Sequence, residues 1–186
     1  RVAAMAVAQV LGIPANTRNY NALLAQIPQH QPSAAPMIDQ TKKLQAVLDA
    51  CSAISPSNHA GRYLLNRGLD WNCLPASQDS PFRHSGALDY WHAVDGKPQR
   101  LATTPALLAR ISKPDGSLAG LHRIYLDQAA RKLELQYGIE PKLLPNKKIM
   151  LAHDGALKGA ACRLFPGGEN GDLAVGEGIE SALGAH

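Results

Sequence analysis

The sequence has few cysteines and no long apolar run. Its three cysteines, Cys51, Cys73 and Cys162, lie too far apart for a CxxC pair. This spacing excludes a zinc ribbon and a disulfide framework, and it predicts buried thiols and no zinc in this chain. Hydrophobic residues make up 45% of the chain, but no run approaches the roughly 20 residues that cross a membrane, and the first residues lack the order of a signal peptide. These absences predict a cytoplasmic protein without a membrane partner.

Acidic and basic residues are segregated along the chain. Residues 1–96 hold seven Lys or Arg and six Asp or Glu, residues 97–163 hold twelve and five, and residues 164–186 hold four acids and no base. A basic middle beside an acidic end suits a protein that binds a polyanion on one surface and a cation next to it. The alternative interpretation is a solvated face without a partner.

Composition and periodicity divide the chain into three parts. Residues 1–38 combine a predicted helix over Val2–Leu11 with a linker rich in Pro and Gln, residues 39–168 form the compact domain, and residues 169–186 begin a further domain. The compact domain should open with a helix that contains Leu44 and Val47 on one face. A second helix should start after Pro56, with Ser57 as N-cap, and end at Gly68.

Short β-rich runs follow from Leu88 onward. They are Leu88–Val94, Ala106–Ser112, Leu118–Leu126, Leu133–Tyr137, Lys148–Ala152 and Ala161–Phe165. Asp95-Gly96 and Asp115-Gly116 are hairpin signals, because glycine accepts the positive φ of tight turns. The predicted fold is therefore α+β, with N-terminal helices, a mostly antiparallel basic sheet and a final strand–helix unit.

The end of the sequence places a carboxylate between two glycines. The apolar run Leu173–Val175 stops at Gly176, and a helical pattern starts at Ile179. This order predicts Glu177 at the carboxyl end of a buried strand, where open α/β sheets bind ligands, and Glu180 in the first turn of the helix. Glu177 is therefore a candidate metal ligand, and the alternative is an acid that interacts with the helix dipole.

Four blocks occur in order between Ala60 and His186. They are Tyr63–Leu69; Ala109–Ile111 with Asp115–Gly116 and Gly120–Leu126; Pro145–Met150 with Leu157–Gly159 and Arg163–Phe165; and Leu173–Leu183. Together they resemble the catalytic core of bacterial DnaG-type DNA primases, especially the divergent primases of plasmids, phages and integrative elements. The last block is similar to the opening strand and helix of a Toprim domain, whose Glu-Gly signature falls on Glu177-Gly178.

The resemblance implies synthesis of RNA primers on single-stranded DNA from ribonucleoside triphosphates, with Mg²⁺ or Mn²⁺ as cofactor in the intact protein and a replicative helicase as a further partner. It implies that Glu177 is a catalytic residue and metal ligand. It also implies template or nucleotide binding by Arg67, Arg110, Arg123, Lys147 or Lys148, and Lys158. Antiparallel pairing would place Arg110 and Arg123 on one sheet surface, and the choice between Lys147 and Lys148 depends on strand register.

Two parts of the primase pattern are missing from this sequence. These are the zinc ribbon that precedes the primase core and the aspartate pair that completes a Toprim metal site. We therefore expect this chain to be a fragment of a primase and to be inactive alone, because Mg²⁺ keeps its waters unless several oxygens converge. Two alternatives stay open: a non-catalytic module that binds single-stranded DNA, and part of another Toprim enzyme such as a nuclease or topoisomerase. Trp71, Tyr90 and Trp91 are expected to pack in the core rather than to stack on bases.

Overall fold

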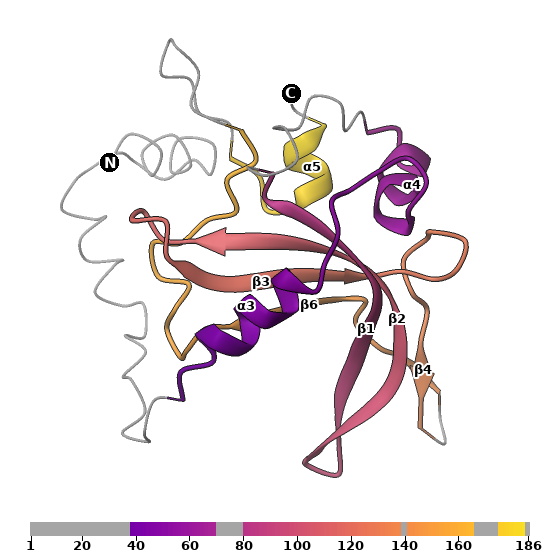
Figure 1. Ribbon diagram of the computed structural model, residues 1–186. Coiled ribbons are helices and arrows are strands. Elements are labelled where there is room, and N and C mark those ends of the chain that lie inside the picture. Colours follow the sequence, from indigo (N-terminus) through magenta and orange to yellow (C-terminus); the bar gives the residue numbers. More distant parts are fainter. Residues whose placement is uncertain (1–37, 70–79, 139–140, 166–174, 185–186) are drawn as a thin grey trace, which may run out of the picture. The chain divides into compact units, whose positions relative to one another are not determined.

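The computed structural model describes residues 38–69, 80–138, 141–165 and 175–184 (Figure 1). All of them belong to one unit, residues 36–186. The predicted helix over Val2–Leu11 lies outside the described residues. Within them the fold is α+β, as the sequence predicts, with a sheet of four antiparallel strands in the order β1-β2-β3-β6. None of the helices in these ranges is long and apolar enough to cross a membrane.

The sheet consists of β1 (Phe82–Val94), β2 (Lys97–Ser112), β3 (Leu118–Tyr125) and β6 (Lys147–Leu151), while β4 (Gln136–Tyr137) and β5 (Lys142–Leu143) form a separate pair. Both predicted hairpin turns are confirmed. Asp95 and Gly96, at φ 50° and 76°, join β1 to β2, and Gly116, at φ 83°, lies between β2 and β3. Glycine adopts this left-handed conformation without strain and Asp tolerates it, so local turn chemistry aligns the three strands.

Several strand predictions need correction. β1 begins earlier than predicted because residues 82–85 pair with residues 106–109 of β2, and β2 begins earlier because its exposed start continues to pair with β1 up to the Asp95-Gly96 turn. The predicted strand Ala161–Phe165 is wrong, since Ala161 makes only an isolated bridge to Ser112. Of the apolar run Leu173–Val175, which was expected to form a strand that ends at Gly176, the structure describes only Val175. Val175 is 82% exposed and belongs to no strand. Leu173 and Ala174 lie outside the described residues.

The helices are α3 (Thr41–Asp49), α4 (His59–Asn66) and α5 (Ile179–Leu183). All three helices lie where the sequence predicts them, but the cap of α4 differs. Asn58 is the N-cap in place of Ser57, and its side-chain oxygen accepts a hydrogen bond from the Gly61 N–H at 3.0 Å. Gly68, at φ 69°, follows the last turn of α4 as predicted.

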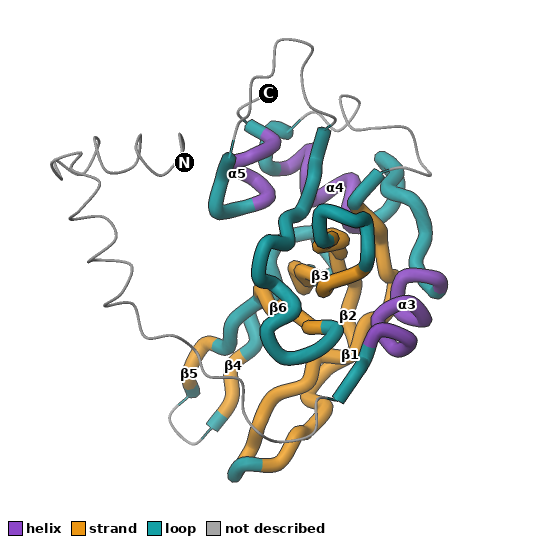
Figure 2. Tube along the Cα trace, turned by 90° about the vertical axis from the view of Figure 1, so that its left-hand side faces the viewer, coloured by secondary structure: helices purple, strands orange, loops and turns teal. Residues whose placement is uncertain are grey.

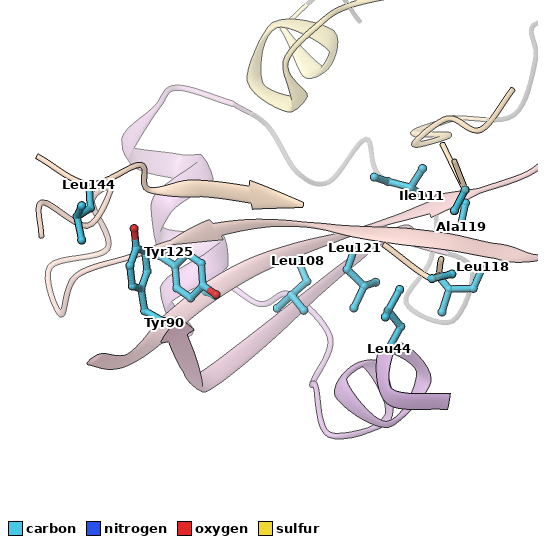
Figure 3. Packing of buried hydrophobic residues seen from close by; sticks show 12 residues of the cluster. Leu44, Tyr90, Leu108, Ile111, Leu118, Ala119, Leu121, Tyr125 and Leu144 are labelled. Carbon is cyan, nitrogen blue, oxygen red and sulfur yellow. The ribbon is translucent and has the colours of Figure 1, made fainter. Parts of the chain in front are cut away.

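The helices pack against opposite faces of the sheet (Figures 1 and 2). On the α3 face, Leu44 belongs to a buried cluster with Leu108, Leu121 and Tyr125 (Figure 3). On the α4/α5 face, a second cluster joins Tyr63, Leu64, Ile179 and Leu183 to the sheet residues Leu107 and Ile124. Since side chains alternate along a strand, His122 of β3 belongs to the α4/α5 face and Arg123 to the α3 face.

The thiols are only partly enclosed by this packing. Cys51 and Cys162 are free and intermediate in exposure, and Cys73 lies outside the described residues. The prediction of buried thiols therefore holds in part. Trp91 was expected to pack in the core as well, but its side chain is 49% exposed.

Candidate functional site

Glu180, in the first turn of α5, accepts hydrogen bonds from side chains of three distant segments. Its Oε1 accepts from the Tyr63 hydroxyl at 2.6 Å and from Lys132 Nζ at 2.7 Å, and its Oε2 accepts from Lys147 Nζ at 3.0 Å. These donors belong to α4, to the segment after β3 and to β6. We call the four residues the Glu180 cluster. One carboxylate thus connects α5 both to α4 and to the edge strand of the sheet.

The hydrogen bonds fix the charge states in the Glu180 cluster. Burial alone raises the pKa of Glu180, but the bonds from Lys132, Tyr63 and Lys147 outweigh burial and hold this pKa far below its usual range. Burial and then the hydrogen bond to Glu180 raise the pKa of Tyr63. At neutral pH the cluster therefore contains a carboxylate, a neutral phenol and two ammonium groups, with one positive charge in excess.

Glu177 lies just before α5 and its side chain is exposed. It lines a pocket of about 330 Å³ on the α4/α5 face, together with His122, Cys162 and apolar side chains such as Ile149. Glu177 is the one carboxylate among the described residues that line this pocket. Within the described ranges, no three His, Cys, Asp or Glu side chains group closely enough to hold a metal ion. Mg²⁺ at Glu177 would therefore need oxygen ligands from other parts of the protein.

Arg67 follows the last turn of α4 and is exposed. It lines a larger pocket of about 740 Å³ with Tyr63, Arg131 and Lys132, and two acids, Asp127 and Glu134, also line this pocket. Tyr63 and Lys132 belong both to this pocket and to the Glu180 cluster. The cavity therefore adjoins the Glu180 cluster, and Arg67 shares it with two of the residues that bind Glu180.

The register of β6 places Lys147 and Lys148 on opposite faces of the sheet. Lys147 is the partner of Ile124, and Lys148 is the partner of Arg123. Lys147 binds Glu180 on the α4/α5 face. On the α3 face, the Lys148 ammonium lies 3.8 Å from the centroid of the Tyr90 ring and donates a hydrogen bond to the Trp91 carbonyl. The two lysines thus belong to separate sites.

The remaining predicted site residues do not converge on the Glu180 cluster. Arg110 pairs with Leu121 and Arg123 with Leu108, so both arginines share the α3 face, as antiparallel pairing predicts. Arg110 is exposed and donates to the Gly116 carbonyl of its own hairpin at 2.9 Å. Lys158 is exposed in the turn after β6, next in sequence to a residue that lines the smaller pocket.

Sequence reasoning missed Lys132 and the partnership of Tyr63 with Glu180. Tyr63 and Glu180 both lie on their predicted helices, but 117 positions separate them in the sequence, and no local pattern predicts their contact. Lys132 reaches the cluster because it forms a bridge with Leu126 after a tight turn that contains Ala130 at φ 58°. The turn lacks the glycine that would have indicated this positive φ.

The fold and the Glu180 cluster define an α+β domain whose antiparallel sheet presents basic side chains on both faces. A family model described as "Domain of unknown function (DUF7146)" matches residues 39–164, and the chain belongs to this family. The matched region contains Tyr63, Lys132 and Lys147, whereas Glu177 and Glu180 lie beyond it. No curated protein and no solved structure matches the chain.

Proposed function

We propose that this chain is part of a DNA primase that binds single-stranded DNA and ribonucleoside triphosphates and, when intact, synthesises RNA primers by metal-dependent nucleotidyl transfer. The main support is that residues from all four primase-like blocks lie in one region of the fold. Tyr63 of the first block and Lys147 of the third both bind Glu180 of the fourth. His122 of the second block lines the same pocket as Glu177. Segments far apart in the sequence therefore meet on the α4/α5 face, as parts of one site should.

The charges of this region suit a triphosphate. The Glu180 cluster has one ammonium in excess, and Arg67 lines the adjoining pocket, in which Arg131 is paired with Asp127. Nucleotidyl transfer needs fixed cations that hold the phosphates and stabilise the charge that develops on them. We assign triphosphate binding to Arg67, Lys132 and Lys147.

Glu177 is assigned to metal binding in the intact protein, where further oxygen ligands would accompany it. Bound Mg²⁺ or Mn²⁺ would supply electrostatic stabilisation of the attacking and leaving oxygens. A cytoplasmic location, a replicative helicase as partner and the absence of zinc belong to the same proposal, because the primase resemblance and the cysteine spacing imply them.

A non-catalytic module that binds single-stranded DNA is the second candidate. It is favoured by Glu177, which is exposed and is the one carboxylate among the described residues of its pocket. A metal-dependent transferase gathers several oxygens around its ions, whereas DNA binding needs only the basic side chains. Primer synthesis distinguishes these two candidates.

The test is primer synthesis by the intact protein that contains this chain, on a single-stranded template with the four ribonucleoside triphosphates and Mg²⁺. Glu177→Gln should lower the rate about 100-fold or more, because a metal ligand stabilises the transition state. Its affinity for single-stranded DNA should stay unchanged. Asp49→Asn, which removes an exposed acid of α3, should change neither property.

Three results would count against the primase assignment. Primer synthesis that is unaffected by Glu177→Gln would refute the catalytic role of Glu177. DNA binding without synthesis by the unmodified protein would favour the non-catalytic module. Cleavage or relaxation of DNA instead of synthesis would indicate another Toprim enzyme.

A further inference from the structure

Two of the cations assigned to the triphosphate already hold an anion of the chain itself. The Glu180 carboxylate accepts from Lys132 Nζ at 2.7 Å through one oxygen and from Lys147 Nζ at 3.0 Å through the other. The Tyr63 hydroxyl donates to the first of these oxygens at 2.6 Å. Two ammonium groups and a hydroxyl that converge on two oxygens are also a donor set that suits a phosphate group. Glu180 therefore lies where a phosphate bound to both lysines would lie.

Glu180 and a triphosphate compete for the same cations. Burial raises the pKa of Glu180, but the hydrogen bonds from Lys132, Tyr63 and Lys147 outweigh burial and hold this pKa far below its usual range. The side chain is thus ionised at neutral pH, and it is only 11% exposed. A negative charge in a partly buried site repels phosphate oxygens placed beside it. The cluster offers one net positive charge with Glu180 in place and two without it, and Arg67 adds another from the adjoining pocket.

The helix that carries Glu180 is short. α5 has five residues, and a helix of this length depends on its packing, because it is not stable by itself in water. Its buried side chains are Ile179 and Leu183, which belong to the apolar cluster of the α4/α5 face. Glu177 precedes α5 by two residues. Release of Glu180 would therefore loosen α5 and shift the candidate metal ligand at its start.

We propose that Glu180 is an internal substitute for phosphate, which a triphosphate displaces from Lys132 and Lys147, and that this displacement releases α5. The identity of the ligand rests on the proposed function. What is added is that the chain's own carboxylate closes the site when it is empty, and that binding at the two lysines is coupled to the position of Glu177. The apparent affinity for the triphosphate is then lowered by the small fraction of molecules in which Glu180 is released.

The first test is calorimetric titration of the 186-residue chain with inorganic tripolyphosphate, at low ionic strength and without metal ions. Glu180→Gln should bind tripolyphosphate about tenfold more tightly than the unmodified chain, because the competing anion is gone. Glu134→Gln is the matched control, since it neutralises an exposed carboxylate that lines the same pocket. It should raise the affinity about twofold at most, because exposed charges are screened. Lys132→Gln should weaken binding about fivefold or more, because it removes a charged hydrogen-bond donor.

The second test follows α5 in the unmodified chain and needs no variant. The N–H groups of Ala182 and Gly184 donate to the carbonyls of Gly178 and Glu180. Saturating tripolyphosphate should speed hydrogen exchange of these two amides about threefold or more, as measured by mass spectrometry, because α5 opens more often once Glu180 is displaced. Peptides that cover α3 should exchange at an unchanged rate.

The sign of the change in affinity separates competition from support. Glu180→Gln should be less stable than the unmodified chain and yet bind the anion more tightly, a combination that a merely structural role does not produce. Circular dichroism establishes that the variant is folded at the temperature of the titration. Weaker or equal binding by Glu180→Gln, or exchange of α5 that tripolyphosphate leaves unchanged, would overturn the inference while the triphosphate site stands. If neither the unmodified chain nor Glu180→Gln binds tripolyphosphate, the triphosphate site of the proposed function fails as well.

Discussion

Replacing Glu180 by Gln should destabilise the domain, because one carboxylate holds α5 to both α4 and β6. The amide keeps the size of the side chain and can still accept from Tyr63, but it leaves Lys132 and Lys147 without their anion. Removing one partner of a fully buried ion pair costs about 3–5 kcal/mol. The side chains of Lys132 and Lys147 are 32% and 38% exposed and keep part of their hydration, so we expect about 2 kcal/mol. That loss corresponds to a melting temperature lower by about 4–8 °C.

The pH dependence distinguishes the charge of Glu180 from its packing. Burial raises the pKa of Glu180, but the hydrogen bonds outweigh burial and depress it below the reference value of 4.5. The Glu180 carboxylate therefore contributes stability that is fully present above the pKa that Glu180 has in the unfolded chain. This stability is lost as the pH falls from that pKa towards the lower pKa of Glu180 in the folded protein. Thermal melting of the native protein and of Glu180→Gln should differ most above about pH 5.5 and differ less towards about pH 3.

Asp49→Asn, at an exposed acid of α3, is the matched control and should have a small effect at every pH. A Gln variant as stable as the native protein at neutral pH would refute the role given to Glu180. A difference that stays constant as the solution is acidified would show that packing, and not charge, holds α5.

Three further predictions concern the packing and the caps. Asn58→Ala removes the N-cap hydrogen bond from the Gly61 N–H and should lower the free energy of unfolding, measured with urea, by about 1 kcal/mol. Ser57→Ala should lower it less, and equal losses would contradict Asn58 as the N-cap. Gly61→Ala would bring a methyl group into a clash with the Ser55 carbonyl and should lower the free energy of unfolding by about 2 kcal/mol or more. An unchanged urea midpoint would show that α4 does not lie against the backbone of Ser55. Partial burial raises the pKa of Cys162 to about 12. Iodoacetamide at pH 8 should therefore alkylate Cys162 more slowly in the folded than in the urea-unfolded protein, and similar rates by peptide mass spectrometry would contradict this protection.

The elements that depend on neighbouring residues could be predicted from the sequence. The helical spacing around Leu44 and the Asp-Gly turns at 95–96 and 115–116 each depend on residues close in the chain, and the structure contains these features. Predictions that rested on apolar character alone were less successful. Ala161–Phe165 has the composition of a strand, but Ala161 is the one residue of this run that pairs with a strand, by an isolated bridge to Ser112.

The candidate sites depend on contacts between distant segments, and these could be predicted only in part. Alternation along β6 requires Lys147 and Lys148 to point to opposite faces, but only the pairing with β3 decides which lysine faces Glu180. The contacts of Glu180 with Tyr63 and Lys132 follow from packing α5 against α4 and from the turn after β3. Glu180 was therefore predicted as a helix residue and not as the centre of a site.

The most direct test of the central claim is the affinity of the unmodified chain for a single-stranded oligodeoxynucleotide, measured by anisotropy between about 50 and about 200 mM NaCl. A primase part that contacts about three backbone phosphates should bind with a log–log salt slope near −2, so that affinity falls about fifteenfold across this range. Duplex DNA of the same length should compete poorly. A folded chain that binds no single-stranded DNA at the lower salt, or that binds with no dependence on salt, would contradict the account.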